Sequence, residues 1–407
     1  MIPSTLCYIC KNNKYLMLHR VKKENDLNEG KWIGVGGKVE PGETPEECML
    51  REVYEETGLT VTKYHCHGVI KFISDTWEDE DMYLFSASEY IGELNPDCNE
   101  GVLEWVDKDR VLSLPTWEGD KYFIKPLLDG EEHIDMLVSY EGDRLVKCEN
   151  LYEPVNTLKS SLISAKHGFS TRTGGISEGI FKSLNLGMNR GDDKLRVIEN
   201  WNRFLRSCDI DNKQFVCGEQ VHGNNVHIAS KADLRPAYGA GHMNVADGYV
   251  TNEPDVALAI FTADCVPVLL EDSEDHVIGA IHCGWRSTVS DIEGEAVKKM
   301  IGLNAKPENI KAAIGPSIDK CCFEVGSEVI DAVIGLIGED AFKYYTPRGD
   351  KFMLDLRGVV KERFIKLGLK PENIENVGGC TMCNPEMFWS HRYTKGERGS
   401  QASIITL

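Results

Sequence analysis

Residues 44–58 constrain this chain more than any other segment, because they contain the start, the apolar stripe and the end of one amphipathic helix. Thr44 suits the N-cap, and Glu47 follows at the spacing of a capping box. Pro45 fits the first helical position, and Gly58 suits the left-handed position that ends many helices. The segment therefore predicts a helix packed on a core, through a stripe of Met49, Leu50 and Val53.

The same helix carries a second, acidic stripe. Glu52, Glu55 and Glu56 stand at positions i, i+3 and i+4, so their side chains leave one neighbouring face. Three such carboxylates repel one another unless a cation compensates them, and Mg²⁺ is commonly shared between carboxylates and substrate phosphates. A solvated acidic face is the alternative for a bare cluster, but the longer sequence pattern around it favours the metal site.

That longer pattern covers residues 37–59, which fit G-x5-E-x7-R-E-U-x-E-E-x-G-U without mismatch, where U is a bulky aliphatic residue. This is the Nudix box, and residues 1–153 resemble a Nudix hydrolase. The resemblance implies an α/β/α sandwich and hydrolysis of a nucleoside diphosphate linked to another group, with metal charge neutralisation and activation of water.

The resemblance also implies roles for the residues of the box. Glu52, Glu55 and Glu56 would hold Mg²⁺, and Glu55 or Glu56 would also orient the attacking water. Arg51 would orient the carboxylates, and Glu43 would support the metal network.

The flanks of the box, residues 30–37 and 114–120, resemble animal-type sanitisers of oxidised purine triphosphates. In those enzymes an Asn, a Trp and two acidic residues form the base pocket. Trp117 and Asp120 occupy matching positions here, whereas Ile33 replaces the Asn and Gly119 replaces one acidic residue. We expect a purine triphosphate pocket whose 8-oxoguanine specificity is in doubt. A plain core position for Trp117 is the alternative.

Length and composition agree with two globular domains. The chain has 407 residues and a net charge of −20, and its first 150 residues hold 31 of the 65 acidic but only 16 of the 45 basic residues. Neither half has the basic footprint of a nucleic-acid binder. No apolar run approaches the roughly 18 residues of a membrane span, and no signal peptide is evident. The 14 cysteines are therefore interpreted as reduced, in a cytoplasmic protein without nucleic-acid or membrane partners.

The polar stretch 149–160 separates two differently patterned regions, so the predicted domains are 1–153 and 154–407. Both halves mix helix and strand, which predicts α/β (α+β) folds. Strands are expected at 5–10, 15–20, 82–86, 248–251, 256–262, 266–270 and 277–281, and helices at 291–301, 324–337 and 359–367.

Three short clusters in the second half carry metal-ligating side chains: His222, Cys265 and His282 each lie at or just past a strand-like run. Such a set suits Zn²⁺ or copper, and three protein ligands leave a position for water or substrate, as in catalytic zinc sites. Each His taken singly is more often an ordinary core or surface residue.

The wider context of these clusters resembles one family. It is carried by residues 167–175, 183–187, 191–193, 314–318 and 384–392. This is the laccase-domain or multicopper polyphenol oxidase family, later associated with purine nucleoside phosphorylase activity. The resemblance implies a four-layer α/β/β/α fold and Zn²⁺ held by His222, Cys265 and His282. It also implies phosphorolysis of adenosine, inosine, guanosine and methylthioadenosine, with adenosine deamination as a second activity.

Two further residues are candidates for this chemistry. Arg172 lies in a Gly-rich turn, where it could bind phosphate or be an ordinary turn cation. Asp264, beside Cys265, is either an acid/base group or a strand-end cap. A zinc-bound water of lowered pKa would suit deamination. The family usually ends with a Gly-Arg pair, and whether Arg398 substitutes for that Arg is left open.

Other functions stay open for the second half. A copper polyphenol oxidase needs many His ligands, but the chain has 11 His and one His-x-His pair, His65 and His67, in the other half. A thiol hydrolase or peptidoglycan editing factor would use Cys265 as nucleophile and His222 or His282 as base. A non-catalytic nucleotide-sensing module is the third alternative.

A last pattern stands apart from these sites. Cys380 and Cys383 form a lone CxxC, which with Cys321 and Cys322 could build a structural zinc site, although buried free thiols are commoner. The sequence as a whole predicts a bifunctional enzyme that acts on purine nucleotides and nucleosides with phosphate, using Mg²⁺ in its first domain and Zn²⁺ in its second.

Overall fold

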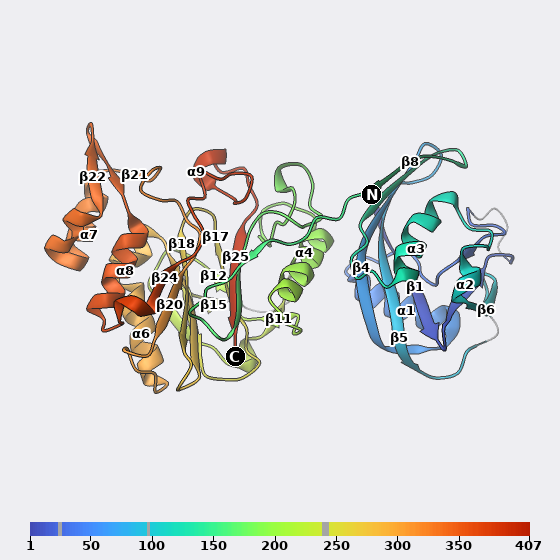
Figure 1. Cartoon of the computed structure of the whole chain (residues 1–407), viewed down its shortest axis with the longest axis horizontal. Helices are drawn as coiled ribbons and strands as arrows, with labels where there is room; N and C mark the ends of the chain where they lie inside the picture. Colours follow the sequence, from blue (N-terminus) through green and yellow to red (C-terminus); the bar gives the residue numbers. More distant parts are fainter. Residues whose placement is uncertain (23–26, 96–97, 238–243) are drawn as a thin grey trace. The chain divides into compact units, whose positions relative to one another are not determined.

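The chain consists of two compact units, Met1–Tyr152 and Glu153–Leu407. The computed structural model describes residues 1–22, 27–95, 98–237 and 244–407 (Figure 1). The amide of Leu151 still donates to the Asp135 carbonyl of the first unit, whereas the Glu153 carboxylate accepts from the Gly174 amide of the second. Among the described residues, no helix combines the length and apolar character needed to cross a membrane.

The N-terminal unit is built around one mixed sheet, ordered β3-β2-β1-β5-β4-β7-β8, with β6 paired to β2. β1 lies parallel to β5 and antiparallel to β2, so the three predicted strands are neighbours. The bounds are β1 (Ile2–Lys11), β2 (Lys14–His19), β3 (Trp32–Ile33), β4 (Thr60–Ser74), β5 (Glu80–Ile91), β6 (Val102–Asp107), β7 (Met136–Glu141) and β8 (Arg144–Asn150).

Helices cover both faces of this sheet, because alternate residues of β1 point to opposite sides. Leu6 and Tyr8 pack in the core that includes α3, whereas Thr5 contacts Cys48 of α1 through a 3.5 Å Oγ1–Sγ hydrogen bond. The result is the predicted α/β/α sandwich. Its helices are α1 (Pro45–Thr57), α2 (Lys108–Val111) and α3 (Lys121–Asp129).

The C-terminal unit contains two main sheets and three small ones. The six-stranded sheet is ordered β13 (Val226–Ile228), β16 (Gly248–Thr251), β19 (Val277–Cys283), β18 (Val266–Asp272), β20 (Lys311–Ile314) and β24 (Ile374–Asn376). The four-stranded sheet is ordered β17 (Leu258–Thr262), β25 (Gln401–Thr406), β10 (Lys166–Ser170) and β9 (Thr157–Leu158). The small sheets pair β11 (Gln214–Phe215) with β14 (Arg235–Pro236), β12 (Gly218–Glu219) with β15 (Asn244–Val245), and β23 (Lys351–Leu354) with β21 (Glu324–Val325) and β22 (Tyr345–Arg348).

Successive side chains of each strand point to opposite faces of its sheet, so each sheet packs on the other sheet with one face and on helices with the other, in the predicted α/β/β/α layers. Leu258 and Ile260 of β17 face the core between the two sheets, whereas Ala259 packs toward α4. In β18, Leu269 faces the same central core, whereas Leu270 faces the layer that contains α6, α7 and α8 (Figure 1). The helices are α4 (Lys194–Ser207), α5 (Trp285–Val289), α6 (Ile292–Gly302), α7 (Ser327–Ile337), α8 (Leu356–Lys366) and α9 (His391–Thr394).

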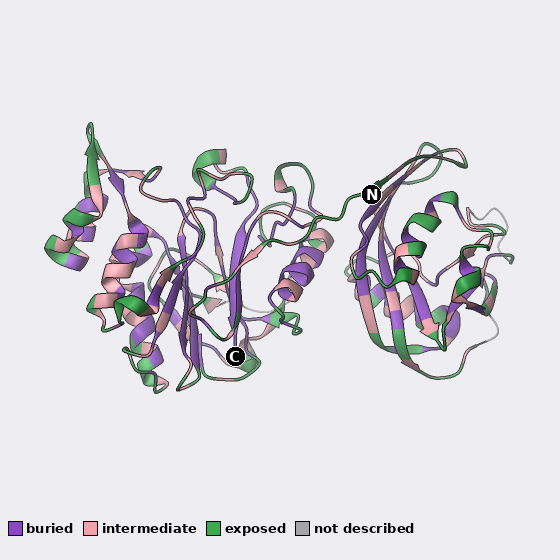
Figure 2. Cartoon of the chain, in the orientation of Figure 1, coloured by how far each residue is buried: buried purple, intermediate pink, exposed green. Residues whose placement is uncertain are grey.

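The strands of both sheets are largely buried, and exposed residues gather on the outer helices and loops (Figure 2). One predicted element needs correction. Residues 324–337 are not a single helix, because β21 occupies Glu324–Val325 and Gly326 is the N-cap from which α7 begins. The predicted helix starts three residues too early, because the residues of β21 are equally compatible with the apolar period of a helix.

Candidate functional site

The acidic helix of the N-terminal unit is capped as predicted. The Glu47 amide donates to Thr44 Oγ1 at 3.2 Å, and the Glu47 carboxylate accepts from the Thr44 amide at 2.8 Å. Gly58 ends the helix in the left-handed region at φ 73°. The preceding loop is held on β1, where Cys7 and Val35 exchange both backbone hydrogen bonds. These contacts fix the box helix beside the loop that faces its carboxylates.

Arg51 organises the carboxylates of the box. Its guanidinium donates to both oxygens of Glu43 at 2.9 Å, to Glu52 at 2.7 Å and to Glu55 at 3.2 Å. The hydrogen bonds that Arg51 donates to Glu43 raise the pKa of Arg51, and the same bonds lower the pKa of Glu43. Both groups are therefore charged across the physiological pH range.

Glu56 points away from this network, into the protein. It is 8% exposed and accepts a 3.2 Å hydrogen bond from the Gly36 amide. Burial, with a further contribution from the charge of Glu52, raises the pKa of Glu56 to about 7. Gly37 leaves room for this network, since a Cβ at that position would displace the carboxylate of Glu52.

The three Glu side chains share one face but do not converge on one point. Among the described residues, only two groups of three or more His, Cys, Asp or Glu have ligand atoms within 4.8 Å of one another, and the box carboxylates are not among them. Arg51 holds Glu52 and Glu55, while the Gly36 amide holds Glu56. Joint metal binding therefore requires their side chains to turn toward the cation.

Trp117 and Asp120 lie together at the end of η1 (Glu118–Asp120). The Trp117 amide donates to the Asp120 carboxylate at 3.2 Å, and burial raises the pKa of Asp120 to about 7. Trp117 is 9% exposed and belongs to the core, so its alternative interpretation as a core aromatic residue is partly right. Lys31 lies over its ring at 4.8 Å, and Asn28 accepts from its indole Nε1–H at 2.9 Å.

The positions of Asn28 and Lys31 beside Trp117 were not predicted, because they are apparent only from the contacts of Trp117 in the fold. Gly119, at a position that is acidic in the resembled enzymes, has a structural cause. Its amide donates to the Tyr140 hydroxyl at 2.6 Å, and a Cβ on Gly119 would lie equally close to that oxygen. An acidic side chain at residue 119 therefore cannot fit while Tyr140 keeps its position.

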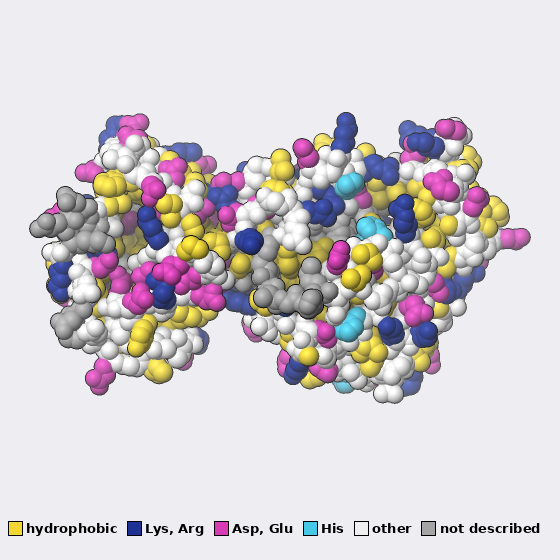
Figure 3. Space-filling view, turned by 180° about the vertical axis from the view of Figure 1, so that it is seen from behind, with side chains coloured by type: hydrophobic (Ala, Val, Ile, Leu, Met, Phe, Trp, Pro, Cys, Tyr) yellow, Lys and Arg dark blue, Asp and Glu magenta, His cyan; other side chains and the backbone are white. Residues whose placement is uncertain are grey.

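The C-terminal unit brings the three predicted ligands together. The ligand atoms of His222, Cys265 and His282 all lie within 4.8 Å of one another. Cys265 Sγ is 3.8 Å from His222 Nε2, and the two imidazole rings are 4.8 Å apart at 77°. His222 is exposed and has φ 61°, Cys265 is half-buried, and His282 is buried. Figure 3 shows His side chains among Lys and Arg on this unit's surface.

Asp247 supports two of these ligands and was not predicted. It is fully buried, and its Oδ1 lies 2.8 Å from His282 Nδ1. It also accepts backbone amides from Val221, His222 and Gly223 at 2.8 to 3.1 Å. The hydrogen bond at Nδ1 leaves Nε2 of His282 for a metal. A charged residue directly before the buried strand β16 was the only signal of this role in the sequence.

The charges of the three ligands are strongly coupled. Burial by itself would raise the pKa of Cys265, but the nearby His282 and His222 outweigh it and lower the pKa to about 6. Burial opposes the charged form of His282, but the Cys265 thiolate and Asp247 raise its pKa to about 9. Without a metal, the pair is therefore a thiolate and an imidazolium near neutral pH.

Asp264 lies beside Cys265 in the left-handed region, at φ 88°. Its carboxylate accepts from the Thr381 hydroxyl at 2.7 Å and from the Arg392 amide at 2.6 Å, and its carbonyl accepts from the Ile318 amide. These contacts tie the metal-ligand loop to two distant segments. Contacts of this kind are those of a strand-end cap, one of the two roles predicted for Asp264.

Arg172 is held by its neighbours. It donates to the Pro385 carbonyl at 2.6 Å and to the Lys182 carbonyl at 2.8 and 3.3 Å, and it stacks on the Trp389 ring at 3.9 Å. Most of its donors are therefore already used.

Another cation, Arg398, lies within the electrostatic influence of Cys265 and Asp264. Arg398 is buried, and burial and the charge of Arg190 lower its pKa to about 10, while Asp264 and Cys265 act in the opposite direction. Burial is the main cause that lowers the pKa of His391, and the charges of Arg398, Arg190 and Arg392 lower it further. The sequence left the role of Arg398 open and gave no signal for Arg190, because only the fold brings Arg398 within the influence of both Arg190 and Cys265.

The His-x-His pair has ordinary partners. It lies on β4, where His67 contacts the Glu131 carbonyl and the Ser86 hydroxyl, and His65 contacts the Glu132 carbonyl. Neither residue belongs to the two described groups that could hold a metal.

Comparison with known proteins assigns both units. The chain belongs to the family described as multi-copper polyphenol oxidoreductase laccase, whose model matches residues 166–407. Residues 2–127 match the NUDIX domain. The class is therefore a Nudix domain followed by a laccase-like domain.

Particular relatives resemble the second domain. The chain is similar to purine nucleoside phosphorylase YlmD of Bacillus subtilis, 34% identical over 242 residues, covering 58% of this chain and 87% of that protein. Purine nucleoside phosphorylase YfiH of Escherichia coli is 35% identical over 238 residues, covering 58% and 92%. The crystal structure of YlmD from Geobacillus stearothermophilus matches with a TM-score of 0.58 and 30% identity, covering 61% and 93%.

Proposed function

We propose that the C-terminal unit cleaves purine nucleosides by phosphorolysis at a zinc centre of His222, Cys265 and His282. The observation that carries this proposal is the convergence of the three ligand atoms within 4.8 Å, with His282 held by the buried Asp247. The names of its relatives support the same activity. The donor set fits the metal, because two imidazoles and one thiolate leave a fourth position open on tetrahedral zinc.

We assign a separate role in the reaction to each group of residues around the centre. When bound, zinc would act as a Lewis acid with an open position. A phosphate oxygen attacks C1′ of the ribose, the N-glycosidic bond breaks, and the purine leaves with a proton. Arg190 and Arg398 are the cations that we assign to phosphate, and we assign His391 to it as a neutral hydrogen-bond donor. Asp264 is the carboxyl that we assign to proton exchange with the purine.

Arg172 contributes to this site through position. A direct bond from Arg172 to phosphate, expected from the sequence, requires it to release the Pro385 or Lys182 carbonyl. In the arrangement described above, it holds the segment that leads to His391. Adenosine, inosine, guanosine and methylthioadenosine are the proposed substrates. Adenosine deamination by a zinc-bound water is a second proposed activity.

A thiol hydrolase is the competing function, favoured by the lowered pKa of Cys265 and its 3.8 Å approach to His222. Metal removal separates the two functions. Chelation abolishes a zinc-dependent reaction, whereas it leaves or exposes a thiolate nucleophile.

The primary test measures phosphate-dependent release of purine base from adenosine and inosine by the full chain. Wild type is expected to release base, and Cys265→Ala is expected to lose about 100-fold or more in rate, because loss of an outer-shell partner alone costs about 10- to 100-fold. Cys217→Ala, which removes a buried thiol of the same unit outside the centre, is expected to keep wild-type activity. No release by wild type, with the Nudix unit still active, would overturn the proposal in favour of the thiol hydrolase, the editing factor or the sensing module.

We further propose that the N-terminal unit hydrolyses purine nucleoside triphosphates with Mg²⁺. Glu52, Glu55 and Glu56 would hold the metal, with Glu55 or Glu56 orienting water, and Arg51 would position the carboxylates. The 8% exposed Glu56 beside the Gly36 amide supports a site in which one carboxylate is shielded from solvent. Trp117 and Asp120 are the proposed base-binding residues, with Lys31 over the indole face.

A further inference from the structure

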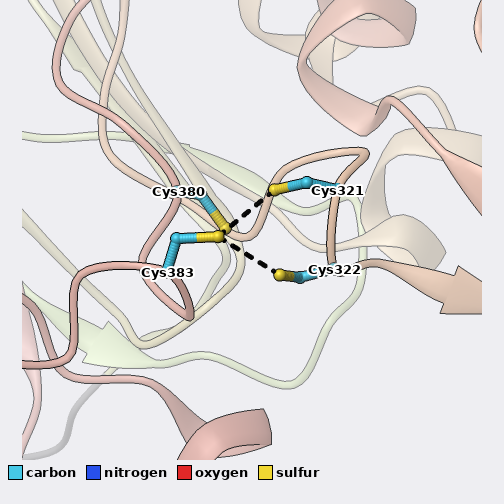
Figure 4. A group of neighbouring side chains, drawn as sticks. All are labelled: Cys321, Cys322, Cys380 and Cys383. Atoms are coloured by element: carbon cyan, nitrogen blue, oxygen red, sulfur yellow. Dashed lines mark hydrogen bonds between the residues drawn. The ribbon is translucent and has the colours of Figure 1, made fainter.

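Four cysteines form a cluster that the proposed reactions do not use. Cys321 and Cys322 lie in the loop between β20 and β21, and Cys380 and Cys383 lie in the loop after β24. Their four sulfur atoms all lie within 4.8 Å of one another, although the two loops are about 60 residues apart in sequence. Figure 4 shows the four side chains pointing toward one common point.

The separations of the sulfur atoms match a shared ion better than a disulfide. Cys383 Sγ is 3.5 Å from Cys321 Sγ and 3.4 Å from Cys322 Sγ. Four sulfurs at about 2.3 Å from one tetrahedral zinc lie roughly 3.8 Å from each other. A disulfide bond is only about 2.05 Å long. The cluster therefore needs only small movements to surround a metal ion.

The backbone holds both loops in place before any ion binds. The Thr381 amide donates to the Ser317 carbonyl at 2.9 Å, and Asn384 donates to the Cys380 carbonyl at 2.8 Å. The Asp319 amide donates to Cys380 Sγ at 3.4 Å. An N–H donor aimed at sulfur stabilises a thiolate, the form that binds metal.

Charged neighbours offset part of the negative charge of such a site. Four thiolates around a divalent ion carry a net charge of −2. Arg357 is 5% exposed, and its guanidinium lies 3.9 Å from the carboxylate of Asp319, the residue whose amide contacts Cys380. A buried cation beside the loop is the arrangement that a dianionic centre requires.

We propose that Cys321, Cys322, Cys380 and Cys383 form a structural zinc site, separate from the His222, Cys265 and His282 centre. Four thiolates close the coordination shell, so the ion has no open position for water or substrate. The ion joins two loops that also hold Asp264, since the first provides the Ile318 amide and the second the Thr381 hydroxyl. The site therefore braces the loop that carries Cys265.

Metal content of the full chain, purified under reducing conditions, tests this proposal. Cys383 is exposed, so Cys383→Ser removes one ligand without opening the core. Wild type and Cys148→Ser, a control in the N-terminal unit, are expected to hold the same zinc content. Cys383→Ser and the double variant Cys321→Ser/Cys383→Ser are expected to hold one equivalent less.

Cobalt substitution supplies a second measurement, in which the wild-type and Cys265→Ala spectra do not depend on how Cys383→Ser folds. Thiolate-to-cobalt charge-transfer absorption of a four-thiolate site is expected in wild type and in Cys265→Ala, and its loss is expected in Cys383→Ser. The His222 centre is judged separately by the zinc lost in Cys265→Ala, so failure of either proposal is distinguishable. Zinc content unchanged in the double variant, or a native mass two hydrogens lower that indicates a disulfide, would overturn the site.

Discussion

At the scale of single residues, the two sites depend on carboxylates that serve in opposite ways. Asp247 is buried but fully hydrogen-bonded, by three backbone amides and His282. His282 and the amides lower its pKa against the effect of burial. Glu56 has one backbone donor, and burial raises its pKa. The number of donors, more than the depth of burial, separates a permanent anion from a group that titrates.

Substitution of Asp247 tests its supporting role. In Asp247→Asn, the partner that selects the His282 tautomer loses its charge, so zinc affinity is expected to fall about 10- to 100-fold. Competition with a chromophoric chelator measures this affinity. Asp233→Asn is the matched control, because Asp233 contacts His227 at 3.2 Å outside the centre. Equal zinc affinity in both variants would contradict the role.

The raised pKa of Glu56 predicts a pH-dependent magnesium site. The folded unit without metal keeps a proton on Glu56 up to about pH 7, whereas the unfolded chain releases it near its usual pKa of 4.5. This stabilising contribution is complete below pH 4.5 and is lost as the pH rises through 7. Mg²⁺ must displace the proton, so its affinity is expected to be about tenfold higher at pH 8 than at pH 6.

Calorimetric titration of Mg²⁺ at several pH values measures this change. Glu56→Gln is expected to weaken binding, remove the pH dependence and abolish triphosphate hydrolysis. Glu46→Gln, on the same helix but outside the box pattern, is expected to behave like wild type. A pH-independent wild-type affinity would contradict Glu56 as the titrating ligand.

At the scale of elements, local signals placed α1 and the central strands well. The capping box, Pro45 and Gly58 act within one segment, so the sequence is sufficient to predict their roles. The predicted start of α7 was wrong because Glu324 and Val325 pair with β23. Local periodicity cannot reveal a pairing with a distant strand. The absence of a side chain at Gly119 is likewise explained only by a distant residue, because the Tyr140 hydroxyl lies against it.

The cap of α1 can be tested by removing its side chain. Thr44→Ala loses the hydrogen bond to the Glu47 amide and is expected to destabilise the start of the helix by about 1 kcal/mol. Hydrogen exchange of the amides at residues 44–58 measures this local opening. Thr62→Ala, at an exposed position of β4, is expected to leave their exchange unchanged. Unchanged protection in Thr44→Ala would show that packing alone holds the helix end.

At the scale of the whole molecule, each site is composed entirely of residues from one unit. The Nudix box lies within Met1–Tyr152, and the His, Cys and His ligands lie within Glu153–Leu407. The two domains, if both act on purines as we propose, would share a common role in cleaning and salvage. A nucleoside monophosphate from the first site must lose its phosphate before the second can use it, so a separate phosphatase reaction is required.

The common role predicts overlapping substrate profiles. At least one purine base is expected among both the triphosphates hydrolysed by the N-terminal unit and the nucleosides cleaved by the C-terminal unit. Parallel assays of the full chain on matched adenine, guanine and hypoxanthine substrates measure this overlap. Glu56→Gln and Cys265→Ala assign each activity to its unit. Profiles without a shared base would remove the common role.

Motifs in the sequence were sufficient to predict the two families and the layered folds, and to propose His222, Cys265 and His282 as metal ligands, because motif spacing is a local property. The supporting contacts are visible only in the tertiary structure. Asp247 contacts His282, and Asn28 contacts Trp117 in the other unit, both across long sequence separations, and no local pattern marks either residue. For the four cysteines the sequence offered a zinc site only as one alternative, and it is the pairing of β20 with β24 that places the Cys pair and the CxxC in one cluster.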